Sequence, residues 1–549
     1  MKSQSPVISS LALMSALALG CGAAPRSAPE TPSAATEAGG EAAAPAVAKE
    51  APPPSEPPRE IHFPPIMRSE TPNGLELNAV ELRALPLVQL KLVIKSGSAD
   101  DPDNLPGLAQ LTASMLKEGT RRSSSAKLAE AIDFLGAHLS IHNDEEHIYL
   151  EMRAMSEHFE RALGLLAEVA MGPRFDAKEL AKLKTRELAR LELQRQNPRF
   201  LASREFHRAA YGEHPYAEID TSADVIKRLN KKHLVDWHRK HFAPNNAFLV
   251  VVGDVGGEQV KEAAGRFFKG WTKRKLSETT YAPVAERAQR QVVIVDRPES
   301  VQSVIYYGNL ALSRGDADYI PLMVANQVLG GSAASRLFMD LREKRSLTYG
   351  AYSDVGERVK VAPFIAFAAV RNEVTAEAVK ALTEHLDRIV SSSAQEQELA
   401  DAKRFLIDRF PLSIDTAGKI AGLVAELRSH GLPDDYWDRF RKEIAQVSAE
   451  GALQAAKKYI KPAQALIVVV GKAAEIKGAL SAYGPVTVLN PEGEVIVKPE
   501  GAAGEKPAAA AAAPAAKPAA EKPAAEKPAA KPAPAKPAPA KTGASKPGA

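Results

Sequence analysis

The sequence predicts an α+β fold made of two homologous halves. A segment that reads as an amphipathic helix, a proline-containing turn, a VVVG strand and a charged residue is found at 231–254 and again at 449–472. Because the copies lie about two hundred residues apart, they indicate a duplicated domain rather than a solenoid. Apolar runs of strand length are interspersed with amphipathic helices, which is the pattern of a mixed sheet packed with helices.

The composition is that of an ordinary globular protein. Of the 549 residues, 45% are hydrophobic and 25% are charged, and this length favours two or more domains. The net charge of +4 is small for the length, so no nucleic-acid partner is indicated. Cys21 is the only cysteine, which excludes an intramolecular disulfide.

Residues 1–21 have the features of a secretion signal. Lys2 supplies a minimal charged region, and 7–19 is mostly apolar but too short to span a bilayer. The segment LALGC, which ends at Cys21, resembles a bacterial lipoprotein signal box, and this resemblance implies lipidation of Cys21. We therefore expect a protein anchored by lipid in the bacterial cell envelope and facing the periplasm. Gly22 replaces the aspartate that marks inner-membrane retention, which favours the outer membrane; the alternative is an ordinary signal peptide with an incidental cysteine.

Two segments lack the residues needed to build a core. Residues 22–60 are mostly Ala, Pro and Glu, and 491–549 are mostly Ala, Pro, Lys and Gly. Such compositions predict a disordered tether and a disordered tail, because they bury too little apolar surface to offset the entropy of ordering. The folded part then divides into a first domain at 61–275, a linker at 276–289 and a second domain at 290–490.

Periodicity and turn residues predict the elements of the first domain. The expected strands are 86–94, 137–152 and 248–254, and the expected helices are 107–116, 125–134, 156–170 and 176–196. The last strand opens with the continuous apolar run FLVVV, as a strand buried on both faces requires.

In the second half, residues 329–353 read as turn, helix and strand. A Gly-Gly pair comes first, an apolar helical run follows, and the segment LTYGAYS is typical of a strand. This stretch resembles the C-terminal half of the pitrilysin/insulysin family of zinc peptidases, the inverzincins. That family has a glycine-rich turn, then SRL, then L-R-E-x-R-x-L-x-Y. The matching residues here are Ser335, Arg336, Leu337, Leu341, Arg342, Glu343, Arg345, Leu347 and Tyr349.

The resemblance extends over both halves and implies the family's arrangement, in which the two halves face each other like a clamshell. It also implies a role for Arg342 and Tyr349. In the family, the matching side chains reach a zinc site built elsewhere, hold the substrate and steady the oxyanion. Losing one such donor commonly costs about 10²–10³ in rate. Taken singly, an arginine in this context is usually on a solvated helix face and a tyrosine at a strand start is usually in the core.

The zinc signature of the family, H-x-x-E-H, is not preserved in the matching frame. The frame GLAQLTASMLKEGT at 107–120 places Gln110 and Ser114 at the two histidines and Ala113 at the glutamate. Glutamine and serine are poor zinc ligands beside imidazole, and alanine cannot transfer a proton. We therefore expect no metal and no cofactor on this chain.

No other cluster in the sequence replaces that motif. The family's third zinc ligand would fall near Leu191, between Glu187 and Glu192, and the sequence leaves open which of them aligns. The run HNDEEH at 142–147 lies on a predicted strand, where a spacing of five points the two rings to opposite faces. The remaining candidates have no ligand spacing and are expected on the surface or in the core: His207, His214, His233, His238 and His241.

These observations lead to a functional expectation that rests on the resemblance. Some bacterial members of the family are heterodimers in which one subunit holds zinc and the other supplies the arginine and the tyrosine. We expect this chain to be the non-zinc subunit of such a periplasmic peptidase, inactive alone, with a homologous zinc-bearing partner and a peptide substrate. The alternative is a catalytically inactive scaffold or peptide-binding clamp of the same fold, and a weaker one is a decoy that competes for partners.

Overall fold

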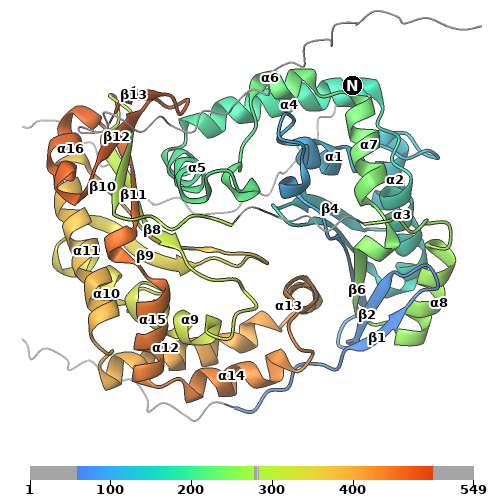
Figure 1. Ribbon diagram of the computed structural model, residues 1–549. Coiled ribbons are helices and arrows are strands. Elements are labelled where there is room, and N and C mark those ends of the chain that lie inside the picture. Colours follow the sequence, from blue (N-terminus) through green and yellow to red (C-terminus); the bar gives the residue numbers. More distant parts are fainter. Residues whose placement is uncertain (1–58, 277–280, 282, 499–549) are drawn as a thin grey trace, which may run out of the picture. The chain divides into compact units, whose positions relative to one another are not determined.

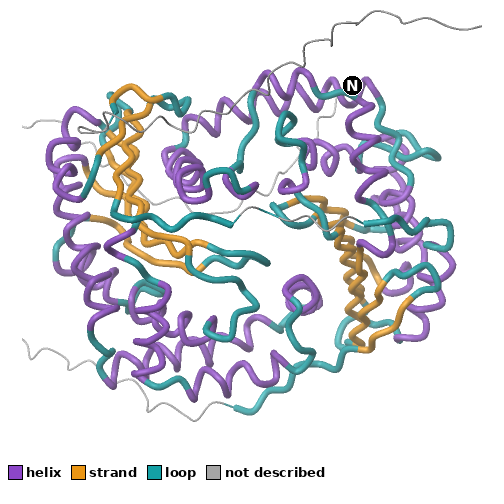
Figure 2. Tube along the Cα trace, in the orientation of Figure 1, coloured by secondary structure: helices purple, strands orange, loops and turns teal. Residues whose placement is uncertain are grey.

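The computed structural model describes residues 59–276, 281 and 283–498. It contains two mixed β-sheets with helices packed around them (Figure 1; Figure 2), so the predicted α+β class with two homologous halves is confirmed. The predicted signal at 1–21 with Cys21, nearly all of the tether and most of the tail lie outside the described residues.

The first sheet has six strands in the order β1-β2-β6-β3-β5-β4. Their bounds are β1 Met67–Glu70, β2 Glu76–Glu81, β3 Leu87–Ile94, β4 His138–Asn143, β5 Ile148–Met155 and β6 Ala247–Gly253. The single strand predicted at 137–152 is wrong, because a tight turn divides it into the hairpin β4–β5. The other two predicted strands of this half are present as β3 and β6.

The second sheet has seven strands in the order β13-β12-β7-β11-β8-β10-β9. Their bounds are β7 Gln291–Asp296, β8 Gln302–Leu310, β9 Thr348–Val355, β10 Pro363–Arg371, β11 Leu466–Gly471, β12 Val486–Leu489 and β13 Val495–Val497. The short strand β13 corrects the prediction that the disordered tail begins at 491, because it pairs antiparallel with β12.

The two sheets share one topology, as a duplicated domain requires. In the first, β6 is parallel to β2 and antiparallel to β3. In the second, β11 is parallel to β7 and antiparallel to β8. The two VVVG strands predicted by the repeat are therefore the equivalent strands β6 and β11.

Both VVVG strands are continuous apolar runs because each is buried on both faces. Leu249 and Val251 of β6 join a core with the helices of the first half, whereas Val250 and Val252 face the core that contains the helices of the second half. All residues of β6 and β11 are buried. Alternation along the strand thus assigns successive side chains to two different cores.

Sixteen α-helices are assigned among the described residues. In the first half they are α1 Leu108–Leu116, α2 Ser125–Phe134, α3 Phe159–Met171, α4 Ala177–Gln196, α5 Pro198–Tyr211, α6 Ala223–Arg228, α7 Lys231–His241 and α8 Gly257–Phe267. In the second half they are α9 Tyr319–Leu329, α10 Arg336–Phe338, α11 Thr375–Ser391, α12 Glu396–Arg409, α13 Ala417–His430, α14 Tyr436–Gln446, α15 Ala449–Tyr459 and α16 Ala473–Leu480. No helix in the described ranges is long and apolar enough to cross a membrane.

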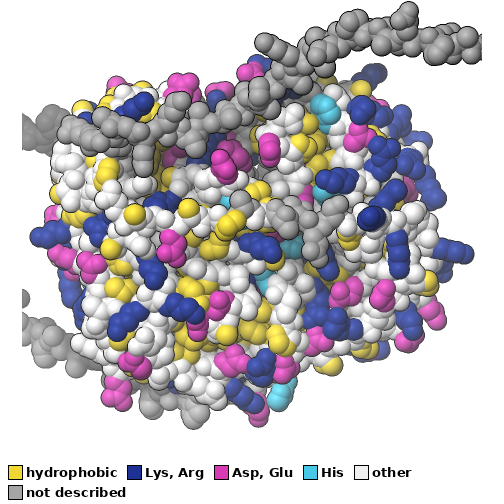
Figure 3. Space-filling model, in the orientation of Figure 1, with side chains coloured by type: hydrophobic (Ala, Val, Ile, Leu, Met, Phe, Trp, Pro, Cys, Tyr) yellow, Lys and Arg dark blue, Asp and Glu magenta, His cyan; other side chains and the backbone are white. Residues whose placement is uncertain are grey.

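Two helices join the halves, because each packs on the sheet of the other half. Helix α5 lies against β8 and β11, where Leu201 and Ala202 contact Val304 and Val470. Helix α13 lies against β3 and β6. On the face drawn in Figure 3, acidic and basic side chains are interspersed, in keeping with the small net charge.

Candidate functional site

The arginine–tyrosine stretch begins where helix α9 ends against strand β9. The Ser353 amide donates to the Gly330 carbonyl over 3.0 Å. A Cβ on Gly330 would lie 2.4 Å from the Ser353 nitrogen, and a Cβ on Gly331 would lie 2.4 Å from the Gln327 side-chain oxygen. The Gly-Gly pair is thus needed because backbone and side chains approach here more closely than any Cβ allows.

Arg342 lies on a π-helical turn rather than on the regular helix expected from the sequence. The turn, η5, spans Met339–Lys344, and the Arg345 amide donates to the Asp340 carbonyl five residues back. Such turns are frequent at functional sites. The Arg342 side chain is 47% exposed, lies 4.8 Å from the centre of the Phe338 ring and is 3.4 Å from the Glu343 carboxylate. Its guanidinium therefore keeps donors free for a ligand.

Tyr349 lies on a β-bulge of an edge strand. Ala368 and Val370 of β10 pair with Ala351 and Thr348 of β9, so β9 has one residue more than β10 across this span. Bulges at sheet edges commonly turn a side chain away from the sheet. Tyr349 is 90% exposed, which makes it the most exposed large hydrophobic side chain among the described residues. Tyr349 is therefore not a core residue, which is what a tyrosine at the start of a strand usually is.

Thr348 holds this bulge. Its hydroxyl donates to the Ala369 carbonyl over 2.6 Å and accepts from the Gly350 amide over 3.2 Å. These two bonds satisfy one backbone group next to Tyr349 on β9 and one opposite it on β10, where the bulge interrupts the ladder. Sequence reasoning missed Thr348, because nothing in a β-branched residue at a strand start distinguishes it from an ordinary strand residue.

Arg336 of the SRL motif is a structural residue. Its guanidinium makes a two-pronged ion pair with Glu398 of α12, with distances of 2.9 and 2.7 Å. The side chain of Arg336 is 5% exposed. The hydrogen bonds from Arg336 lower the pKa of Glu398 to about 2. This pair fixes the turn that carries Arg342 to the neighbouring helix.

The segment that matches the family's zinc motif, 107–120, still contains a helix, but it lacks the zinc ligands; we call it the vacated frame. Gln110 and Ser114 lie one helical turn apart on α1, and the Gln110 amide nitrogen donates to Glu187 of α4 over 3.2 Å. Glu187 also pairs with Arg190 over 2.7 Å. Glu187, one turn before the buried Leu191, is therefore the glutamate that faces the frame, which the sequence had left open.

A cavity of about 600 Å³ opens beside this frame, and Gln110, Ser114 and Arg190 are among its lining residues. Glu187 is a side chain that zinc accepts, but glutamine and serine are not, so these residues do not fit the zinc ion of the zinc peptidases. Within the described ranges, no three His, Cys, Asp or Glu side chains are arranged to hold a metal ion.

Comparisons with known proteins agree with this arrangement. The sequence model "Insulinase (Peptidase family M16)" matches residues 83–220, and "Peptidase M16 inactive domain" matches 228–406. A solved structure, the peptidase M16 inactive domain from Pseudomonas fluorescens, is 30% identical with a TM-score of 0.70, and the match covers 74% of this chain and 98% of that one. The chain belongs to peptidase family M16.

Curated M16 relatives carry two kinds of name. An "Uncharacterized zinc protease" of Rickettsia bellii is 24% identical over 288 residues, which is 52% of this chain and 69% of the relative. A "Non-peptidase homolog" of Helicobacter pylori is 23% identical over 371 residues, which is 67% of this chain and 85% of the relative. The chain is thus an M16 protein of the inactive-domain type. Both its match to the inactive-domain model at 228–406 and the missing zinc ligands at 107–120 support this.

The run HNDEEH at 142–147 covers the end of β4 and the turn that leads to β5, which corrects the prediction that it lies on a single strand. The Asp144 carboxylate accepts from the amides of Glu146 and His147 over 2.7 and 2.6 Å and from the Tyr149 hydroxyl over 2.8 Å. Burial opposes its ionisation, but hydrogen bonds from His147 and Tyr149 lower the pKa of Asp144 to about 2. The signal for this turn was present in the sequence, because Asn-Asp pairs favour turns that bond their own backbone.

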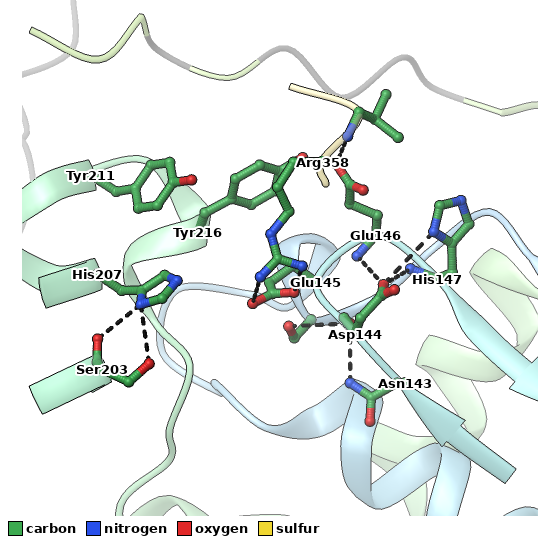
Figure 4. A network of polar contacts seen from close by, with 12 residues as sticks. Asn143, Asp144, Glu145, Glu146, His147, Ser203, His207, Tyr211, Tyr216 and Arg358 are labelled. Atoms are coloured by element: carbon green, nitrogen blue, oxygen red, sulfur yellow. Dashed lines mark hydrogen bonds and ion pairs between the residues drawn. The ribbon is translucent and has the colours of Figure 1, made fainter. Parts of the chain in front are cut away.

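This turn joins the first half to the loop between β9 and β10 (Figure 4). Glu145 makes an ion pair of 2.5 Å with Arg358, and Glu146 accepts from the Val359 amide over 2.8 Å. The Tyr211 hydroxyl donates to the Val361 carbonyl over 2.8 Å. Burial raises the pKa of both Glu145 and Glu146. The two M16 halves are therefore connected by the buried carboxylate of Glu145 and the half-buried carboxylate of Glu146, each of which has a partner on the other half.

The helix histidines are structural. His238 bonds the Ala170 carbonyl over 2.8 Å, and His241 bonds the Ser96 hydroxyl over 2.9 Å. Burial lowers the pKa of His207, His238 and His241 to about 4, so these rings are neutral at ordinary pH. This agrees with the expected core role.

The predicted site residues form two separate groups in the M16 fold. Gln110, Ala113 and Ser114 lie on α1 beside Glu187, whereas Arg342 and Tyr349 lie on η5 and β9 of the other half. Across the described part of the chain, no hydrogen bond or ion pair joins the two groups. The donors of the second group are therefore directed to solvent rather than to the vacated frame of the same chain.

Proposed function

We propose that this chain is the non-zinc subunit of a heterodimeric M16 zinc peptidase and that it supplies Arg342 and Tyr349 to a zinc site on a homologous partner. The proposal rests on one contrast: the donor residues are in place, whereas the zinc-motif positions have lost their ligands. Arg342 and Tyr349 are exposed on a π-turn and a β-bulge that other residues of the chain hold in place. The frame at Gln110 and Ser114 has lost the chemistry that such donors would serve.

In the proposed reaction, the partner's metal would activate the water that attacks a peptide carbonyl. Arg342 would bind the substrate backbone through its planar donors, and the Tyr349 hydroxyl would donate to the oxygen that becomes negatively charged.

We also propose that Cys21 carries a lipid and that the folded body faces the periplasm from the outer membrane. This rests on the signal-like segment at 1–21 and on the Ala-, Pro- and Glu-rich composition of the segment that follows it. Labelling cells with a fatty-acid analogue should mark the chain, and Cys21→Ser should abolish the label. A Cys21→Ser chain that stays labelled and membrane-bound would contradict lipidation at this residue.

The test of the catalytic proposal uses the chain with an M16 homologue from the same genome that has an intact H-x-x-E-H motif. Co-purified, the pair should cut unstructured peptides in a chelator-sensitive manner, and each protein alone should not. Arg342→Ala and Tyr349→Phe should each lower kcat by about 10²–10³ without loss of assembly. Unchanged turnover in both variants would refute the in-trans role.

Matched controls separate site chemistry from surface changes. Tyr352→Phe alters a tyrosine three residues further along β9, and Arg371→Ala removes an exposed arginine that pairs with Glu373. Both should leave kcat unchanged.

The second candidate function is a scaffold or peptide-binding clamp without any cleavage. The name of the Helicobacter pylori relative, "Non-peptidase homolog", favours this alternative. Under it, the co-purified pair binds peptide, and Arg342→Ala weakens peptide binding with no cleavage in any combination.

A further inference from the structure

A second cavity lies where the β4–β5 turn meets the loop between β9 and β10. Its volume is about 350 Å³, which is within the size range of small-molecule sites. Its walls come from both halves, and four of its lining residues are lysines: Lys95, Lys240, Lys275 and Lys360. The acidic side chains that line it are Asp100 and Glu146.

The four lysines have no carboxylate partner among the described residues. Lys95 instead places its ammonium 5.6 Å from the centre of the Phe248 ring. Besides burial, the charge of Lys360 lowers the pKa of His214. At His241, burial lowers the pKa, the charge of Asp100 raises it and the charge of Lys240 lowers it. Like charges gathered around one opening repel each other, so an anion bound there would relieve a cost already present in the fold.

The two carboxylates offset only part of this charge, because the cavity lining holds four lysines against two acidic side chains. Glu146 accepts from the Val359 amide over 2.8 Å and from the Tyr216 hydroxyl (Figure 4). Asp100 accepts from the Gly97 amide over 3.2 Å. The cavity therefore has an excess of positive charge.

We propose that this cavity binds a small, multiply charged oxyanion of the phosphate or polycarboxylate class. Lysine ammonium groups are strong point-charge partners for such oxygens. The Tyr216 and Tyr281 rings, whose centres are 6.0 Å apart, line the same space and give the ligand an apolar wall. Because Lys95 belongs to the first half and Lys360 to the second, the bound anion links the halves. The site is independent of the peptidase role.

The test is isothermal titration of the full chain with sodium pyrophosphate and with sodium citrate, against sodium chloride at the same ionic strength. Saturable binding of either probe, with a rise in melting temperature, is the expected result. Pyrophosphate alone would assign the phosphate class, and citrate alone the polycarboxylate class. Saturation by neither probe would overturn the proposal.

Lysine variants locate the binding. Lys95→Gln with Lys360→Gln should weaken the probe affinity by at least about tenfold, a change of one decade in Kd. Lys269→Gln with Lys442→Gln is the matched control, because these lysines are also exposed and do not line the cavity. An equal loss in both pairs would show a diffuse charge effect and would also overturn the proposal. Circular dichroism of the natural chain and of the two double variants checks that all three proteins are folded.

Discussion

The ion pair between Glu145 and Arg358 gives a prediction that can be worked from the structure. The two terminal guanidinium nitrogens of Arg358 lie 2.5 and 2.8 Å from the Glu145 carboxylate oxygens, and the side chains of Glu145 and Arg358 are only 11% and 22% exposed. Arg358→Met keeps the apolar stem and leaves a buried carboxylate without its partner. Deleting one member of a buried pair costs about 3–5 kcal/mol, and the partial exposure of Arg358 places the expected loss at about 3 kcal/mol.

The pH dependence of this loss has a definite sign. Burial already holds the pKa of Glu145 above its ordinary value, and removing Arg358 raises that pKa further. A carboxyl with a raised folded pKa favours the folded state when protonated, and this contribution is lost as pH rises through the folded pKa. Arg358→Met should therefore cost more at about pH 8 than at about pH 5.

The assay is urea unfolding followed by tryptophan fluorescence, since Trp237 and Trp271 report on the first half and Trp437 on the second. The double variant with Glu145→Gln should recover much of the loss, because the pair then leaves no unpartnered charge at position 145. Arg371→Met is the control, because its pair with Glu373 is exposed and worth about 0–1 kcal/mol. If Arg358→Met costs no more than this control, or costs more at low pH, the reasoning is refuted.

Three further predictions concern the sites. Thr348→Val should lower turnover of the paired enzyme roughly tenfold by releasing the bulge, whereas Thr348→Ser should preserve it; equal rates would contradict the positioning role. Gln110→His with Ser114→His should create a zinc site whose affinity can be measured by competition with a chromogenic chelator. Adding Glu187→Gln should weaken that affinity; an unchanged affinity would show that another residue is the third ligand. The hydrogen bonds from Arg336 lower the pKa of Glu398 from 4.5 to about 2, so their stabilisation is present above pH 4.5 and is lost as pH falls toward 2. Melting temperatures of Glu398→Gln should therefore fall less across that window than those of the natural chain, and parallel curves would contradict the assignment.

The fold was predictable where one physical pattern dominated. Strands β6 and β11 are continuous apolar runs because both of their faces are buried, and no alternative pattern competes there. The hairpin β4–β5 was read as one strand because the residues on both sides of the turn have the same period, although Asn143 and Asp144 signalled the reversal.

The sequence motif proposes which residues form the site, but it does not give their geometry. The motif identifies Arg342 and Tyr349, but a π-turn differs from an α-helical turn by one hydrogen-bond register, and a bulge by one residue of pairing. Both depend on tertiary partners such as Glu398 and Ala369, which lie on other elements. The choice of Glu187 over Glu192 likewise required the packing of α4 on α1.

The central claim is that this chain supplies the arginine and the tyrosine and leaves the metal to its partner. Zinc content, measured by mass spectrometry on the chain purified alone and on the co-purified pair, tests it most directly. The account predicts no bound zinc in the chain alone and stoichiometric zinc in the pair, with peptide cleavage in the pair only. Stoichiometric zinc in the chain alone, with cleavage that a chelator abolishes, would contradict it.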